Sequence, residues 1–239
     1  DAARERGIPV SNVPTYGTDS VAQFVFGVVL RWARRPELHD QAVRQGEWTA
    51  CPDFCFWKTP QVELGGLAMG IVGFGRIGRR VGELAHAFDM KVLAADPVKD
   101  NPPTYEPFEW KAAPAIFEEA DVVSLHCYQT PDNAGMVDRG LLDRMKPDSL
   151  FINTARGGLV NEADLAAALE AGRPGAAAVD VVSVEPIRPD NPLLRARNCL
   201  ITPHIAWAAL SARQRLMKTT AENIRAFIGG KPINVVNGA

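Results

Sequence analysis

The sequence predicts an α/β protein built on a doubly wound parallel sheet. Two observations support this prediction: short apolar runs alternate with helix-like segments from residue 68 to residue 205, and the first run leads into a glycine-rich turn. Such alternation is typical of parallel sheets that bind ligands at the carboxyl ends of their strands. The expected strands lie near residues 68–73, 90–95, 121–126, 149–153, 176–182 and 198–202.

Composition limits the classes of protein that this chain can belong to. Its 239 residues are 46% hydrophobic, enough for one large core and part of a second. The net charge is −2, which argues against nucleic-acid partners and acidic membrane surfaces. We find neither a signal-like start nor an apolar stretch of about 18 residues, so a soluble, cytoplasmic protein is expected. The four scattered cysteines indicate reduced thiols, and no metal site is expected.

The region before the first strand predicts a long helix and a loop. Ser20 and Gln23 have the spacing of a capping box, so the helix is expected to start at Ser20 and to weaken before Pro36. Residues 46–63 hold aromatic side chains and prolines, which predicts an ordered loop packed by aromatics. Helix and loop together carry more apolar surface than one domain needs, which favours a homodimer over ordinary interdomain packing.

The segment from residue 68 to residue 96 contains the most specific motif, Gly73-x-Gly75-x-x-Gly78 after an apolar strand. Gly73 permits a sharp turn, Gly75 has no side chain to block a pyrophosphate, and Gly78 lets the next helix approach the sheet. A helix N-terminus also favours anions. The motif therefore predicts a dinucleotide-binding fold of the Rossmann type.

Asp96 ends the second expected strand, close to the separation of about 20 residues typical of an acid that binds the adenosine ribose. A carboxylate at this position would accept hydrogen bonds from the ribose hydroxyls and repel the extra phosphate of NADP. NAD is therefore the expected cofactor. The alternative, a structural glycine turn followed by an incidental acid, does not explain the complete strand, turn, helix and strand pattern.

Three residues that follow expected strands could carry chemistry. Arg156 could hold a carboxylate through two parallel hydrogen bonds, although a surface ion pair is the simpler alternative. His204 could exchange a proton near neutral pH, but His126 also ends a strand, and spacing alone does not separate the two. The carboxylate of Glu185 next to a histidine would favour the protonated imidazolium and orient the ring. The alternative is an exposed loop acid without such a contact, which the sequence alone does not distinguish.

Four segments resemble the signatures of the NAD-dependent D-2-hydroxyacid dehydrogenases, in order and over essentially the whole chain. These segments are residues 70–78, 153–160, 180–186 and 202–207. Within that family, residues 202–207 and 232–237 are most similar to glycerate dehydrogenases and to hydroxypyruvate or glyoxylate reductases, with phosphoglycerate dehydrogenases close behind. The resemblance implies reduction of a small 2-oxo acid by NADH to the D-2-hydroxy acid, and the reverse reaction.

The same resemblance implies roles for individual residues. Arg156 would bind the substrate carboxylate, and His204 rather than His126 would be the acid/base, with Glu185 as its partner. The cofactor would also be contacted by backbone N–H groups of Arg76 and Ile77 at the pyrophosphate, by Thr130 near the adenine and by Asp180 at the nicotinamide carboxamide.

The resemblance also implies two domains. Residues 18–209 would form the NAD-binding domain, and residues 1–17 and 210–239 would be remnants of a flavodoxin-like substrate domain. The helix-like start at Asp1 suggests a fragment that lacks an upstream segment, including a glycine-containing loop that would also bind substrate.

A final helix over residues 211–227 is expected to bury Leu216, Met217, Ala221, Ile224 and Phe227.

Two other readings remain open at this stage. One is an NADH-responsive binding module similar to the transcriptional corepressors that resemble this family, although the chain has no appended interaction tail. The other is a truncated product without function, which would gain no thermal stability from NADH.

Overall fold

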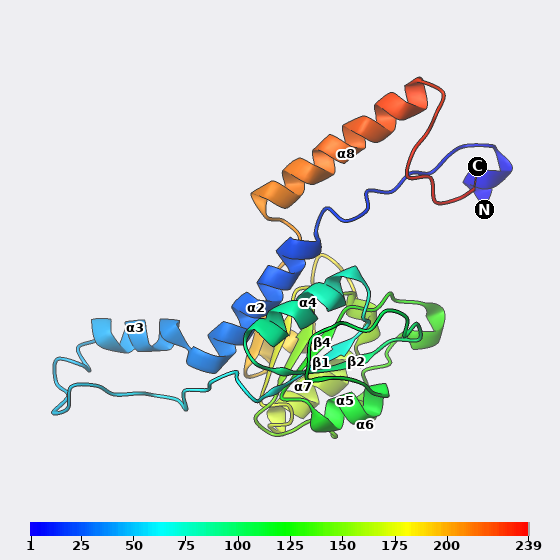
Figure 1. The fold of residues 1–239 in the computed structure, drawn as a ribbon. Coiled ribbons are helices and arrows are strands. Elements are labelled where there is room, and N and C mark those ends of the chain that lie inside the picture. The colour runs from blue at the N-terminus through cyan, green and yellow to red at the C-terminus, as the bar shows by residue number, and fades with distance from the viewer. Residues whose placement is uncertain (239) are drawn as a thin grey trace.

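The computed structural model describes residues 1–238, in which seven strands form one parallel sheet (Figure 1). Its strand order is β3-β2-β1-β4-β5-β6-β7. The strands are β1 (Ala68–Val72), β2 (Lys91–Ala95), β3 (Phe108–Trp110), β4 (Val122–Leu125), β5 (Leu150–Asn153), β6 (Ala176–Val179) and β7 (Cys199–Ile201). The order reverses between β1 and β4, where sheets of this kind open a crevice for ligands. The predicted parallel α/β fold is confirmed.

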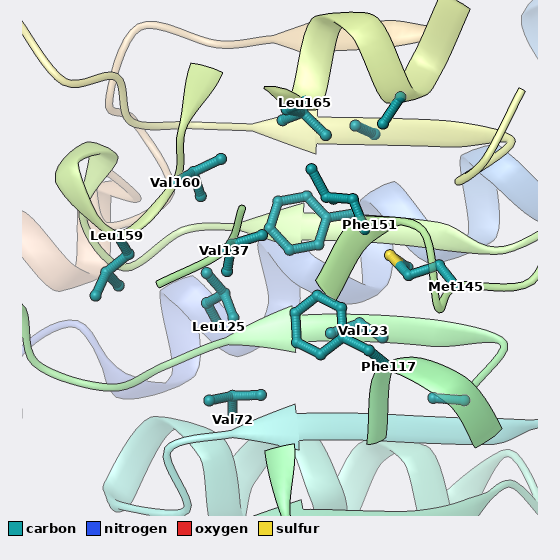
Figure 2. Packing of buried hydrophobic residues seen from close by; sticks show 14 of the residues in the cluster. Val72, Phe117, Val123, Leu125, Val137, Met145, Phe151, Leu159, Val160 and Leu165 are labelled. Carbon is teal, nitrogen blue, oxygen red and sulfur yellow. The ribbon is translucent and has the colours of Figure 1, made fainter. Parts of the chain in front are cut away.

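Helices cover both faces of the sheet. On one face lie α2 (Thr18–Arg34) and α4 (Arg76–Ala87), and on the other lie α5 (Ala113–Glu119), α6 (Arg139–Leu142) and α7 (Glu162–Glu170). Figure 2 shows the core on the second face, where Phe117 and Phe151 pack beside Val123. The remaining helices are α1 (Ala2–Glu5), α3 (Pro36–Arg44), η1 (Pro131–Asn133), η2 (Gly157–Leu159), η3 (Pro192–Arg195) and α8 (Leu210–Ile228).

Strand β3 was not predicted from the sequence. It is three residues long, lies at the sheet edge and has Glu109 at its centre, so it lacks the apolar run that marks the other strands. Its aromatic side chains are ordered by Phe74, whose ring centroid lies 5.3 Å from that of Phe108 and 5.4 Å from that of Trp110.

The predicted capping box of the long helix was wrong. Helix α2 begins at Thr18, with Gly17 as its N-cap, and the Ser20 hydroxyl donates to the carbonyl of Ala206 at 2.7 Å. A tertiary contact therefore uses the group that local spacing assigned to the helix end. Arg35 takes a left-handed conformation with φ of 43°, which separates α2 from α3 at the predicted break.

The prediction that aromatics pack the loop after α3 was also wrong. This segment extends away from the sheet (Figure 1), and Trp48, Phe54 and Trp57 are 51%, 90% and 68% exposed. Few residues of the chain pack against these side chains, because the loop extends beyond the core. A large apolar surface therefore faces solvent.

Helix α8 occurs where it was expected, but its predicted buried face is largely exposed. Met217, Ile224 and Phe227 are each more than half exposed, and α8 projects from the sheet beside the two chain ends (Figure 1). Its neighbours are short extended segments joined to it by polar contacts, such as the Asn223 amide that donates to the carbonyl of Asn12 at 2.9 Å. Such segments cannot cover an apolar helix face. Of the predicted segment 210–239, residue 239 lies outside the described residues.

Candidate active site

Close backbone approach explains two of the three motif glycines. Gly73 follows β1 with φ of +96°, and a Cβ on it would lie 2.3 Å from the backbone nitrogen of Cys127. A Cβ on Gly78 would lie 2.1 Å from the carbonyl oxygen of Gly73. Neither position can hold a side chain, so the turn and α4 lie tightly against the carboxyl ends of β1 and β4.

Gly75 is different, because a Cβ there would meet no atom of the protein within 4 Å. It is the N-cap of α4, and the N–H groups of Arg76 and Ile77 in the first turn have no acceptor within the helix. The positive end of the helix dipole adds to this field. The open space and the unused donors together fit the pyrophosphate of a dinucleotide.

A cavity of about 1130 Å³ opens in front of this turn. Asp96 lies on its wall, where Oδ2 accepts from the Phe74 N–H at 2.7 Å and Oδ1 accepts from the Val98 N–H at 2.8 Å. These bonds tie the glycine turn to the loop after β2. Each carboxylate oxygen keeps a further lone pair for a ligand hydroxyl.

Part of the cavity wall comes from the segment after β4. Thr130 caps η1, and its N–H donates to Oδ1 of Asn133 at 2.7 Å. Cys127 and Tyr128 line the same cavity and were missed in the sequence, because neither belongs to a motif. Only the position of their segment after a central strand could have indicated them.

Asp180 is buried directly after β6 and organises the loop that carries His204. Its Oδ1 accepts from the Thr202 hydroxyl at 2.6 Å and from the Ile205 N–H at 2.9 Å, and its Oδ2 accepts from the Ala206 N–H at 2.8 Å. Thr202 is a third residue that sequence reasoning did not single out. Three donors on one buried carboxylate satisfy most of its hydrogen-bonding capacity.

His204 faces Glu185 across the end of the sheet. The distance between Nδ1 of His204 and Oε2 of Glu185 is 2.7 Å, which leaves Nε2 as the ring nitrogen available to a ligand. The two side chains are 43% and 39% exposed, so the pair can be reached from solvent. His204 has a φ of 55°, a strained value that its N–H bond to the carbonyl of Asp180 at 2.8 Å helps to hold.

The electrostatics around Glu185 favour its ionised form. Burial raises its pKa, but hydrogen bonds from His204 and the Val182 N–H, with the charges of His204 and Arg156, outweigh burial and hold the pKa below its ordinary value. Nη1 of Arg156 donates to the carbonyl of Ala155 at 2.6 Å.

The second candidate histidine has a different environment. Burial lowers the pKa of His126 to about 3, and its Nε2 lies 2.9 Å from the Ser124 hydroxyl oxygen. His126 is therefore neutral at physiological pH, without the carboxylate partner that His204 has. It lines the cavity in front of the glycine turn.

Neither a metal nor a membrane site is evident in the described part of the chain. Within residues 1–238, no three His, Cys, Asp or Glu side chains are grouped so that they could hold a metal ion. Over the same residues, no helix has the length and apolar content needed to cross a bilayer.

The strand order, the glycine turn at the switch point and the adjoining cavity define a dinucleotide-binding domain. Residues 26–206 match the family described as D-isomer specific 2-hydroxyacid dehydrogenase, NAD binding domain. The chain belongs to this family, whose members bind a nicotinamide dinucleotide and 2-oxo or 2-hydroxy acids.

Three known proteins illustrate the relationship. The hydroxypyruvate reductase of Blautia hydrogenotrophica is 45% identical over 99% of this chain and 74% of its own length. The glycerate dehydrogenase of Methylorubrum extorquens is 38% identical, over 98% of this chain and 73% of its own. The crystal structure of an NADPH-dependent glyoxylate/hydroxypyruvate reductase from Sinorhizobium meliloti, with NADP and malonate, has a TM-score of 0.84 at 28% identity and covers 98% and 72% of the two chains.

Proposed function

We propose that this protein reduces a small 2-oxo acid, of the hydroxypyruvate or glyoxylate type, to the D-2-hydroxy acid with NADH, and that it catalyses the reverse reaction. The contact of His204 with an ionised Glu185, at the strand edge that also forms the dinucleotide cavity, carries this proposal. The similarity to a hydroxypyruvate reductase and a glycerate dehydrogenase supports the substrate class.

A nicotinamide cofactor held at this site would supply a hydride to the substrate carbonyl carbon. In our proposal, Arg156 holds the substrate carboxylate through parallel hydrogen bonds, and His204 gives a proton to the carbonyl oxygen. In the reverse direction His204 takes the hydroxyl proton. Glu185 stabilises the imidazolium and keeps Nε2 directed to the substrate, since it occupies Nδ1.

The cavity in front of the glycine turn is lined by five of the proposed cofactor contacts, Gly73, Gly75, Arg76, Asp96 and Thr130. The pyrophosphate would bind Gly73, Gly75 and Gly78 of the turn with the N–H groups of Arg76 and Ile77. The ribose would meet Asp96 and the adenine Thr130. Asp180 would use its last free lone pair for the nicotinamide carboxamide, since three donors of the His204 loop use the others.

We propose NAD rather than NADP as the physiological cofactor. The carboxylate of Asp96 is held at the cavity wall by two backbone N–H groups and cannot turn away easily. Repulsion between this carboxylate and a 2′-phosphate supports the choice, although the similar reductase from Sinorhizobium meliloti binds NADP.

We also propose that residues 1–17 and 210–239 belong to a substrate domain, separate from the NAD-binding domain of residues 18–209. Two observations support this division. The first segment pairs with the chain end through the antiparallel bridge of Ser11 with Val235, and α8 exposes apolar side chains that a domain core would cover.

The free thiols of the four cysteines support a cytoplasmic location.

A homodimer is part of the proposal. The segment after α3 exposes Trp48, Phe54 and Trp57, and a hollow of about 400 Å³ lies between α2 and β7. Exposed apolar surface of this extent is typical of protein interfaces. A second copy of the chain could cover both features.

The test is NADH consumption with hydroxypyruvate, glyoxylate and 3-phosphohydroxypyruvate by the complete natural gene product. In the variant His204→Ala, kcat is expected to fall by about 10²–10⁴-fold because the proton donor is lost, while the Kd for NADH stays unchanged. Equal activity in the variant would exclude His204 as the acid. Tight NADH binding without turnover of any 2-oxo acid would instead favour an NADH-responsive binding module.

A further inference from the structure

A carboxylate on α7 holds the loop that carries Glu185. Oε1 of Glu162 accepts from the Ser183 N–H at 2.7 Å, and its Oε2 accepts from the Ser183 hydroxyl at 2.8 Å and from Nδ2 of Asn191 at 2.9 Å. Hydrogen bonds to an ionised acceptor are about twice as strong as neutral ones. Ser183 therefore has both of its donors fixed by one side chain.

Helix capping does not explain this arrangement. The N-cap of α7 is Asn161, whose Oδ1 accepts from the N–H groups of Ala163 and Asp164, both at 3.2 Å. The Glu162 side chain instead leaves its own helix and binds residues that follow β6. Its contacts are tertiary.

The same peptide also packs against Gly157. A Cβ on Gly157 would lie 1.9 Å from the carbonyl carbon of Val182 and 2.4 Å from the nitrogen of Ser183, so the backbone next to Arg156 lies directly against this peptide. The Val182 N–H then donates to Oε1 of Glu185 at 3.2 Å, and Oε2 of Glu185 faces His204. An unbroken series of contacts thus leads from Glu162 to the histidine.

We propose that Glu162 is a positioning residue for proton transfer: by fixing Ser183 against Gly157, it sets the bend that presents Glu185 to His204. The inference rests on the proposed roles of His204 and Glu185. The same clamp joins the Arg156 loop to the Glu185 loop, so the group that would bind the substrate carboxylate and the group that orients the acid keep a constant separation.

The charged groups near the pair determine how the inference can be tested. Glu185 is influenced by His204 and Arg156, and Asp180 lies under the His204 loop through its bonds to Ile205 and Ala206. Glu162→Ala removes both charge and contacts. Glu162→Gln removes the charge but keeps an oxygen that can accept from the Ser183 N–H. Glu170→Ala, an exposed acid of the same helix, is the matched control.

The first readout is the titration of the Glu185 carboxyl carbon, followed by NMR in the complete protein. In the wild type its pKa lies below the ordinary value. In Glu162→Ala the pKa is expected to rise toward that value, because the bonds from His204 and Val182 loosen together with the loop. Glu162→Gln is expected to restore part of the shift, and Glu170→Ala is expected to match the wild type.

The second readout is kinetic. A misplacement of about 1 Å at a reacting group costs up to about 10²-fold in rate, so kcat in Glu162→Ala is expected to fall by about 10- to 100-fold with an unchanged Kd for NADH. If Glu162→Ala does not fold, Ser183→Ala removes only the hydroxyl contact and is expected to shift both readouts in the same direction.

The outcomes separate the inference from the proposed reaction. If Glu162→Ala matches Glu170→Ala in the Glu185 titration and in kcat, the positioning role is overturned. If the titration shifts as expected but the wild-type protein turns over no 2-oxo acid, the positioning of Glu185 stands and the proposed reaction fails.

Discussion

His204 keeps a backbone conformation that is rare outside glycine because Asp180 holds the residues around it. The carboxylate of Asp180 binds Thr202, Ile205 and Ala206, and its carbonyl oxygen binds the His204 N–H. A strained backbone conformation of this kind persists only where several surrounding contacts hold it in place. The backbone conformation of His204, the proposed proton donor, therefore depends on one buried acid.

The variant Asp180→Asn tests this dependence. An amide has one acceptor oxygen, so at least one of the three donors would face an NH₂ group and lose its bond. We expect a loss of about 1–3 kcal/mol in the free energy of unfolding and a lower kcat, because the His204 loop relaxes. Urea unfolding and steady-state kinetics measure the two effects. The exposed Asp190→Asn should change neither, and equal losses in both variants would contradict the role of Asp180.

Acidification is expected to lower the stability of the folded protein through protonation of Glu185. Since its pKa is lowered from the ordinary value of 4.5, Glu185 contributes stability that is present above about pH 4.5 and is lost as the pH falls through the lowered value. Unfolding measured between pH 3 and pH 6 should therefore show a steeper loss of stability on acidification for the wild type than for Glu185→Gln. Parallel curves would mean that the contact with His204 contributes nothing to folding.

At the scale of elements, the buried strands were predictable and the irregular ones were not. Strands β1, β4 and β5 are buried on both faces, so each is a largely apolar run that can be recognised without knowledge of its neighbours. Strand β3 forms because β2 pairs with its three residues of mixed polarity and the ring of Phe74 packs against Phe108. Nothing in its own residues distinguishes it from a loop.

The segment after α3 provides the prediction at this scale. Replacing Phe54 and Trp57 by serine should leave the domain folded, because both side chains are exposed, but should weaken a dimer through lost apolar burial. Sedimentation at micromolar concentration measures the change. A wild-type protein that sediments as a monomer would remove the dimer proposal, and Phe88→Ser, at a partly exposed site next to α4, serves as a control.

At the scale of the whole molecule, the cofactor should couple to stability. A ligand that binds only the folded state at about 100 times its Kd adds about 2.7 kcal/mol to the free energy of unfolding. We expect NADH to raise the melting temperature clearly and NADPH to raise it less at equal concentration, because Asp96 repels the 2′-phosphate. Thermal melts with each cofactor measure this, and Asp96→Ala should narrow the difference. Equal stabilisation of the wild type by both cofactors would refute the preference for NAD.

The sequence by itself determined the parallel sheet, the glycine turn and the strand-end positions of Arg156, Glu185 and His204. These features depend on local periodicity and on residues that follow one another in the chain. Spacing alone did not separate His204 from His126; the family resemblance favoured His204, and the tertiary structure shows that His204 meets a carboxylate. Only the tertiary structure revealed that Glu162 binds Ser183. The physical reason is distance along the chain: these contacts join residues 19 and 21 positions apart, and packing of the strands between them, not local spacing, brings them together.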